Sequence, residues 1–161
     1  MDPISISFAI GSVWGLLQAT GKIIDFLSSL PYFPNTAANI LIECHALHAI
    51  FTQVKDFISD QDQQGITRKS QTSLNYLVAA LAGCVKALLE LDKVLKRLGA
   101  PADNNDGSNY KFTFFVKLKW MMKENYIKQT LRDLQMHKIS LHFLLFIYSR
   151  SVATLMISHP F

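Results

Sequence analysis

An uncharged stretch at the start of the chain constrains its fold more than any other feature. No residue from Pro3 to Gly21 is charged, and small residues recur there at every fourth position. Residues four apart lie on one face of an α-helix, where small side chains let another backbone approach closely. An interior glycine costs a helix about 1 kcal/mol relative to alanine, so two of them on one face indicate a packing role. This small-residue strip consists of Ser7, Gly11, Gly15 and Ala19.

The same stretch also carries an apolar stripe, which predicts a helix over about residues 3–29. Asp2 suits the N-cap, Pro3 suits the first helical position, and Pro31 ends the pattern. The stripe recurs at helical spacings and comprises Ile6, Ile10, Val13, Leu17, Ile24 and Leu27. Such a helix can be buried in a bundle, or it can leave the bundle and enter a membrane.

Three further helices are predicted, over about residues 36–58, 67–98 and 124–155. Two of them keep an unbroken four-and-three spacing of apolar residues, whereas Lys138 interrupts the third seam. The fold class is therefore all-α: an antiparallel bundle of four long helices with room for a fifth short one, and residues 1–161 as a single domain. We interpret residues 59–65 as a loop and 111–123 as an irregular lead into the last helix. We expect the first helix to pack against the other three.

Composition places this bundle among apolar, intracellular chains. Half of the 161 residues are hydrophobic and only 17% are charged, below the roughly 25% of an average domain. Cys44 and Cys84 both occupy predicted seams, so we expect buried thiols rather than a disulfide framework. Asp2 stands where a secretory signal has basic residues. These features predict a cytoplasmic protein.

Positive charge concentrates in the second half of the chain. Residues 111–138 hold seven basic and two acidic side chains, a net charge of +5. Lys117, Lys119 and Lys123 surround Trp120 there, which allows three interpretations. The lysines cover buried aromatic side chains, or contact an anionic membrane with Trp120 at its surface, or contact nucleic acid. We favour the first two and expect no nucleic-acid partner.

The sequence contains no motif of an enzyme or of a cofactor site. Phosphate-binding glycine loops, nucleophile elbows and zinc-protease motifs are all missing. His45 and His48 have a spacing that can chelate a metal, but no third ligand is evident and Glu43 falls on another face. We therefore expect no catalytic, cofactor or metal site.

Two segments resemble a fungal protein family. The opening Met1-Asp2-Pro3-Ile4-Ser5-Ile6, followed by a Gly/Ala-containing apolar helix, resembles the HeLo-like N-terminal domain of fungal STAND proteins, of the azaphilone pigment cluster protein L type. A later stretch is similar to that family's "K-W-x-x-K-E…L…L…H-K…L" pattern. It comprises Lys119-Trp120-Met121-Met122-Lys123-Glu124, Ile127, Leu131, Leu134, His137-Lys138 and Leu141.

The resemblance implies a helical signalling bundle at the front of a receptor-like protein. Relatives of this family cause cell death by self-association and membrane insertion of N-terminal segments. Applied to this chain, it implies self-association through the small-residue strip and entry of the apolar stripe into lipid. Lys117, Lys119 and Lys123 would hold the anionic leaflet. The alternative is a soluble adaptor domain of a STAND-like receptor that binds a signalling protein and never contacts lipid.

Overall fold

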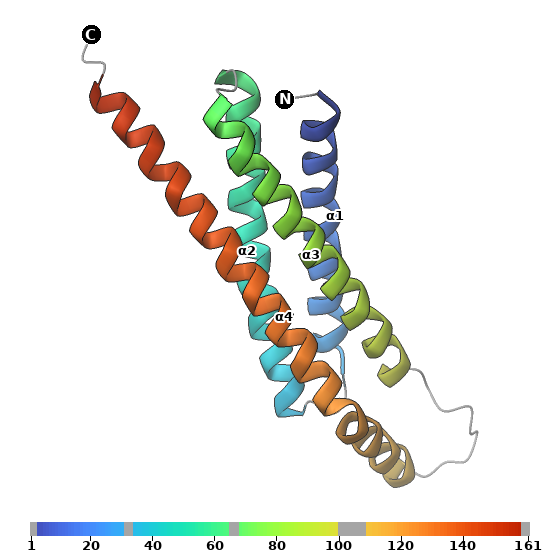
Figure 1. The fold of residues 1–161 in the computed structure, drawn as a ribbon. Coiled ribbons are helices and arrows are strands. Elements are labelled where there is room, and N and C mark those ends of the chain that lie inside the picture. Colours follow the sequence, from blue (N-terminus) through green and yellow to red (C-terminus); the bar gives the residue numbers. More distant parts are fainter. Residues whose placement is uncertain (1–2, 31–33, 65–67, 100–108, 159–161) are drawn as a thin grey trace.

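Four long helices make up the fold of the chain. The computed structural model describes the backbone of residues 3–30, 34–64, 68–99 and 109–158, and the side chains of 11–30, 34–60, 74–98 and 116–150. The helices are α1 (Pro3–Ser28), α2 (Asn35–Gln64), α3 (Arg68–Gly99) and α4 (Asn109–Ser158). They run alternately in opposite directions (Figure 1). The predicted all-α antiparallel bundle is thereby confirmed, and the described segments contain no fifth helix.

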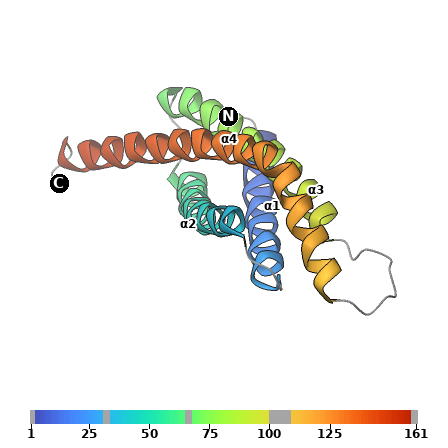
Figure 2. The ribbon, with the colours of Figure 1, turned by 90° about the horizontal axis from the view of Figure 1, so that it is seen from below.

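The helices pack in a ring rather than around one central helix. Within the described residues, α1 packs on α2 and α3, and α4 packs on the same two helices. Neither α1 and α4 nor α2 and α3 contact each other there. Figure 2 shows the contacting helices α1 and α2 side by side on one side of α4. The expectation that the first helix packs against all three others is therefore wrong, because α4 lies diagonally opposite to it.

The predicted seams of α2 and α3 form the core. Every apolar position of these two seams is buried, which confirms the four-and-three spacing as the signal of the buried face. The α2 seam comprises Ile40, Cys44, Leu47, Phe51, Val54 and Ile58. The α3 seam comprises Leu74, Leu77, Leu81, Cys84, Leu88, Leu91, Leu95 and Leu98.

The buried face of α1 is rotated relative to the predicted stripe. Val13 and Leu27 are buried as predicted, but Leu17 and Ile24 are only half-buried. The buried positions are Val13, Leu16, Thr20, Ile23 and Leu27. Thr20 occupies this seam because its hydroxyl bonds the Leu16 carbonyl at 2.9 Å and His48 Nδ1 at 3.0 Å, which satisfies the polar group inside the core.

Two predicted helix boundaries are wrong. Residues 59–64 continue α2, since no glycine or proline interrupts the chain before Gly65. α4 begins at Asn109 rather than near residue 124, so the segment 111–123 is helical. Trp120 in that segment is only 4% exposed, and burial of this large side chain outweighs the weak helix propensity of its aromatic neighbours. With 50 residues, α4 is about 75 Å long.

Polar contacts join α4 to its two neighbours. Lys138 Nζ lies 2.6 Å from Glu43 Oε2, and Gln135 Nε2 donates to the other oxygen of Glu43 at 3.0 Å. Lys138, which interrupts the apolar seam of α4, thus forms an ion pair with Glu43 of α2. On the α3 side, the Tyr126 hydroxyl donates to Glu90 at 2.8 Å, which lowers the pKa of this carboxyl group.

The helices α3 and α4 are in close contact at Gly83. A methyl group at this position would lie 2.2 Å from His137 Cε1 and 2.5 Å from His137 Nε2. The imidazole of His137 therefore rests on the bare backbone of α3, where no other residue than glycine fits without movement.

Candidate functional site

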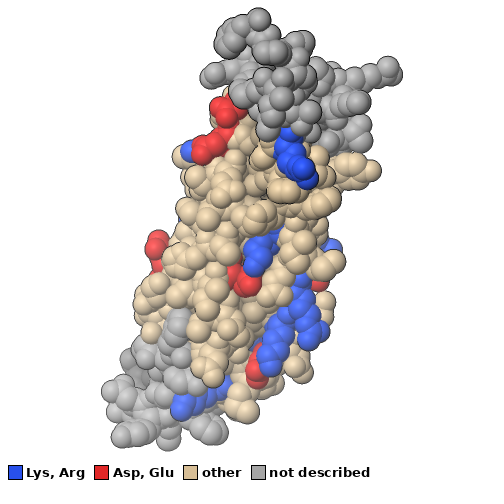
Figure 3. Space-filling model, turned by 90° about the vertical axis from the view of Figure 1, so that its left-hand side faces the viewer, with Lys and Arg blue, Asp and Glu red and all other residues tan. Residues whose placement is uncertain are grey.

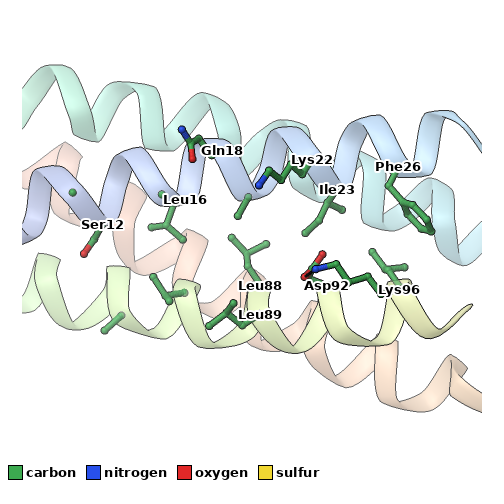
Figure 4. A pocket seen from close by; sticks show the side chains of 16 residues that line it. Ser12, Leu16, Gln18, Lys22, Ile23, Phe26, Leu88, Leu89, Asp92 and Lys96 are labelled. Carbon is green, nitrogen blue, oxygen red and sulfur yellow. Dashed lines mark ion pairs between the residues drawn. The ribbon is translucent and has the colours of Figure 1, made fainter. Parts of the chain in front are cut away.

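An apolar groove lies between α1 and α3 and is the main candidate site. Its volume is about 940 Å³. The α1 wall is formed by residues 11–26 and the α3 wall by residues 82–96, and aliphatic side chains from both helices point toward each other across it (Figure 4). The lining residues used below are Gly11, Gly15, Ala19, Lys22, Ala82, Val85, Leu89, Asp92 and Lys96.

Three of the four residues of the small-residue strip line this groove. Gly11 and Gly15 are exposed and Ala19 is half-buried. A methyl group added at Gly11 or Gly15 would have no neighbour within 4 Å, in contrast to the crowded position of Gly83. The two glycines therefore do not bring α1 close to another helix of the same chain. The fourth residue, Ser7, lies outside the residues whose side chains are described.

The predicted apolar stripe lies on the other side of α1, toward the core. Val13 is completely buried and Leu17 is half-buried, whereas Ile6 and Ile10 lie outside the described side chains. The strip and the stripe thus occupy different faces of the same helix. Only a separation of α1 from the rest of the bundle would expose Val13 to lipid.

The charged groups of the groove lie together in one stretch, with Phe26 beyond them. Lys22 projects from α1, and Asp92 and Lys96 lie on the opposite wall in the same stretch (Figure 4). Asp92 and Lys96 form an ion pair with an N–O distance of 2.6 Å. Lys22 has no ion pair among the described residues. The groove therefore has an excess of one positive charge in this stretch and none along the rest of its length.

The predicted anionic-surface lysines are not brought together with the strip. Lys117 and Lys123 are exposed and Lys119 is half-buried, all on α4, which does not contact α1. Trp120 between them is buried, which favours the first interpretation of this segment, with lysines above buried aromatic side chains, in this structure.

A second exposed apolar surface runs along the outer face of α4, and it was not among the predicted site residues. Four large side chains at helical spacing are each more than half exposed: Met136, Ile139, Phe143 and Phe146. On the side of the molecule where α2 and the C-terminal part of α4 lie, charged side chains are sparse and uncharged atoms predominate (Figure 3). The signal in the sequence is the nearly all-round apolar character of residues 141–148, half of which faces outward. We call these four residues the α4 stripe.

The thiols and histidines have structural surroundings. Burial raises the pKa of Cys84 to about 12, and burial together with the nearby Glu43 carboxylate does the same for Cys44. His45 is exposed, while His48 bonds Thr20 across the α1–α2 contact. Within the described residues, no group of three or more His, Cys, Asp or Glu side chains is placed to hold a metal ion.

Comparison with known proteins does not assign the chain to a family. No protein-family model, no curated protein and no solved structure matches it. The resemblance to HeLo-like domains remains a prediction from the sequence. In the described part of the chain, residues 74–98 of α3 are long and apolar enough to cross a membrane, a property shared by the core helices of soluble proteins.

Proposed function

We propose that the chain is a non-enzymatic signalling bundle of the HeLo-like type that acts by self-association through α1. One observation carries the proposal: Gly11 and Gly15 lie open along the α1–α3 groove, with nothing within 4 Å of the position of a side chain. Glycine in a helix interior is unfavourable, and no contact within the described bundle compensates for it here. A helix of a second copy, docked on the strip, would supply that contact.

In this proposal α1 is the helix that leaves the bundle. α1 packs only on α2 and α3, and the groove already separates part of its surface from α3. When strips of several copies dock together, Val13 and Leu17 lose their neighbours and become available to lipid. Lys117, Lys119 and Lys123 then attract an anionic leaflet with roughly 1 kcal/mol each. In this proposal the protein is cytoplasmic at rest and membrane-associated when active.

The α4 stripe supports a second candidate, a soluble adaptor domain of a STAND-like receptor. Met136, Ile139, Phe143 and Phe146 form an exposed apolar row on a helix surface. Rows of this kind bind amphipathic helices of partner proteins. In this case α1 stays in the bundle and no lipid is contacted.

Leakage of dye from vesicles that contain anionic lipid tests the leading proposal. Gly11→Leu combined with Gly15→Leu should abolish leakage while helical circular dichroism is retained, because the added side chains have room in the groove but block docking. Gly21→Leu is the matched control: it lies on the same helix with an equally open position, outside the groove lining. Unchanged leakage in the double variant would refute the role of the strip. If the wild-type protein also fails to sediment with the vesicles at low salt, the adaptor is favoured.

A further inference from the structure

We propose that the α1–α3 groove binds a free long-chain carboxylate, with the carboxylate at Lys22 and the alkyl chain along the two helical walls. The inference goes beyond the proposed function in assigning a ligand. It rests on that function only where it predicts that ligand binding and self-association exclude each other. Three properties of the groove carry it: its apolar walls, the position of its charge and the packing of its two helices on each other.

The walls suit an alkyl chain. The groove has about 940 Å³ of space, within the range of roughly 300–1,000 Å³ of small-molecule sites, many of which lie between the helices of bundles. Apart from the charged groups, Ser12 and Gln18 are polar, and the rest of the lining is apolar, with Val85 and Leu89 on the α3 wall and Gly11 and Gly15 on the α1 wall. Each CH₂ group transferred from water into such surroundings contributes about 0.8 kcal/mol.

The charge selects an anionic head group. Asp92 and Lys96 neutralise each other at 2.6 Å, so Lys22 provides the excess charge of the lining. From Lys22 to Gly11 the α1 wall extends for about 16 Å at 1.5 Å per residue, which is long enough for an extended alkyl chain to lie along it. A carboxylate at Lys22 would leave the alkyl chain beside the glycines.

The packing of α1 on α3 favours an alkyl chain over a helix as the occupant of the groove in the resting bundle. The two helices have Cα atoms within 8 Å of each other, so they are packed neighbours. A third helix, with a diameter of about 10 Å or more, can insert between the two walls only when this contact opens. The carboxylate therefore binds the closed bundle, whereas a second copy binds the opened one. Binding of one opposes binding of the other.

Isothermal titration calorimetry with palmitate below its micelle concentration tests the assignment. The protein is held at a concentration where sedimentation velocity shows monomers, so that binding is measured independently of self-association. We expect saturable binding at one site, with Gly15→Leu lowering the affinity by about 10-fold or more because the new side chain fills the groove. Gly21→Leu should leave the affinity unchanged.

The head group is tested by Lys22→Gln and by the ligand itself. Because Lys22 is exposed, loss of its charge should weaken palmitate binding by only about 2- to 5-fold. Lys123→Gln, an identical change on α4, should have no effect. Cetyl alcohol should bind wild type and Lys22→Gln equally well.

Several results would overturn the proposal. They are the absence of saturable palmitate binding, equal effects of Gly15→Leu and Gly21→Leu, and uptake of palmitate only when it is part of a bilayer. The exclusion is tested separately: palmitate should reduce vesicle leakage by wild-type protein. If palmitate binds as expected but the Gly11→Leu, Gly15→Leu variant still causes leakage, the proposed function fails and the ligand site stands.

Discussion

The contact of His137 with Gly83 gives the sharpest test of the helix packing. A Cβ atom at position 83 would lie 2.2 Å from His137 Cε1, so the imidazole would have to move by more than 1 Å to reach an ordinary carbon–carbon separation of about 3.5 Å. Overpacking of this kind costs about 1–3 kcal/mol. The same substitution removes an interior glycine from a helix, which contributes about 1 kcal/mol in the opposite direction. Gly83→Ala should therefore lower the free energy of unfolding by about 0–2 kcal/mol.

A double-mutant cycle separates these two effects. In a His137→Ala background the clash is absent, and Gly83→Ala should raise the free energy of unfolding by about 1 kcal/mol. The two residues should thus show a coupling energy of about 1–3 kcal/mol. Urea titrations followed by far-ultraviolet circular dichroism measure all four variants. Gly21→Ala is the control, because its open position predicts stabilisation by about 1 kcal/mol in both backgrounds. Equal effects of Gly83→Ala with and without His137 would refute the contact.

Three further predictions concern an ion pair, the thiols and the α4 stripe. Lys138→Ala should lower the free energy of unfolding by about 1–2 kcal/mol in chemical denaturation, because the Glu43 side chain, only 13% exposed, then lacks the ammonium group that pairs with it. The same substitution in a Glu43→Leu background should have a smaller effect. Burial holds the pKa of Cys44 and Cys84 at about 12, so on a rise in pH the thiols of the unfolded chain lose their protons before those of the folded chain. The free energy of unfolding should therefore be unaffected below pH 8 and fall above pH 9, by roughly 1.4 kcal/mol per thiol at pH 10. Replacement of both cysteines by alanine should remove this decline. Phe143→Gln should leave the free energy of unfolding within about 0.5 kcal/mol while reducing the fluorescence of a bound apolar dye.

The regular spacing of apolar residues predicted the buried faces of α2 and α3 correctly. Where this spacing is broken, the sequence did not predict the packing. The leucine seam of α3 predicted burial correctly because every turn repeats the same information. In α1 the buried face passes through Thr20, whose hydroxyl is satisfied by a histidine from another helix, and no pattern in α1 alone reveals that partner. The start of α4 was missed because burial of Trp120 depends on surfaces that form only in the folded bundle.

The residues of the small-residue strip were singled out from the sequence, but their arrangement in the candidate site was not predicted. The strip of Gly11 and Gly15 stands out in the sequence, whereas its openness depends on how far α3 lies from α1. Gly83 shows the opposite case: an interior glycine with the same local sequence signal, but with a histidine from α4 against its backbone. Only the tertiary packing distinguishes a glycine that accommodates a neighbour from one that leaves a surface free.

Disulfide cross-linking between copies tests the central claim most directly, namely that the strip of one α1 meets the strip of another. In a background where Cys44 and Cys84 are replaced by alanine, Gly15→Cys places one thiol on the strip, and Gly21→Cys places one on the same helix outside the groove. With anionic vesicles and a mild oxidant, Gly15→Cys should give a covalent dimer rapidly and Gly21→Cys slowly. Equal rates for the two variants, or no dimer from Gly15→Cys, would contradict the account.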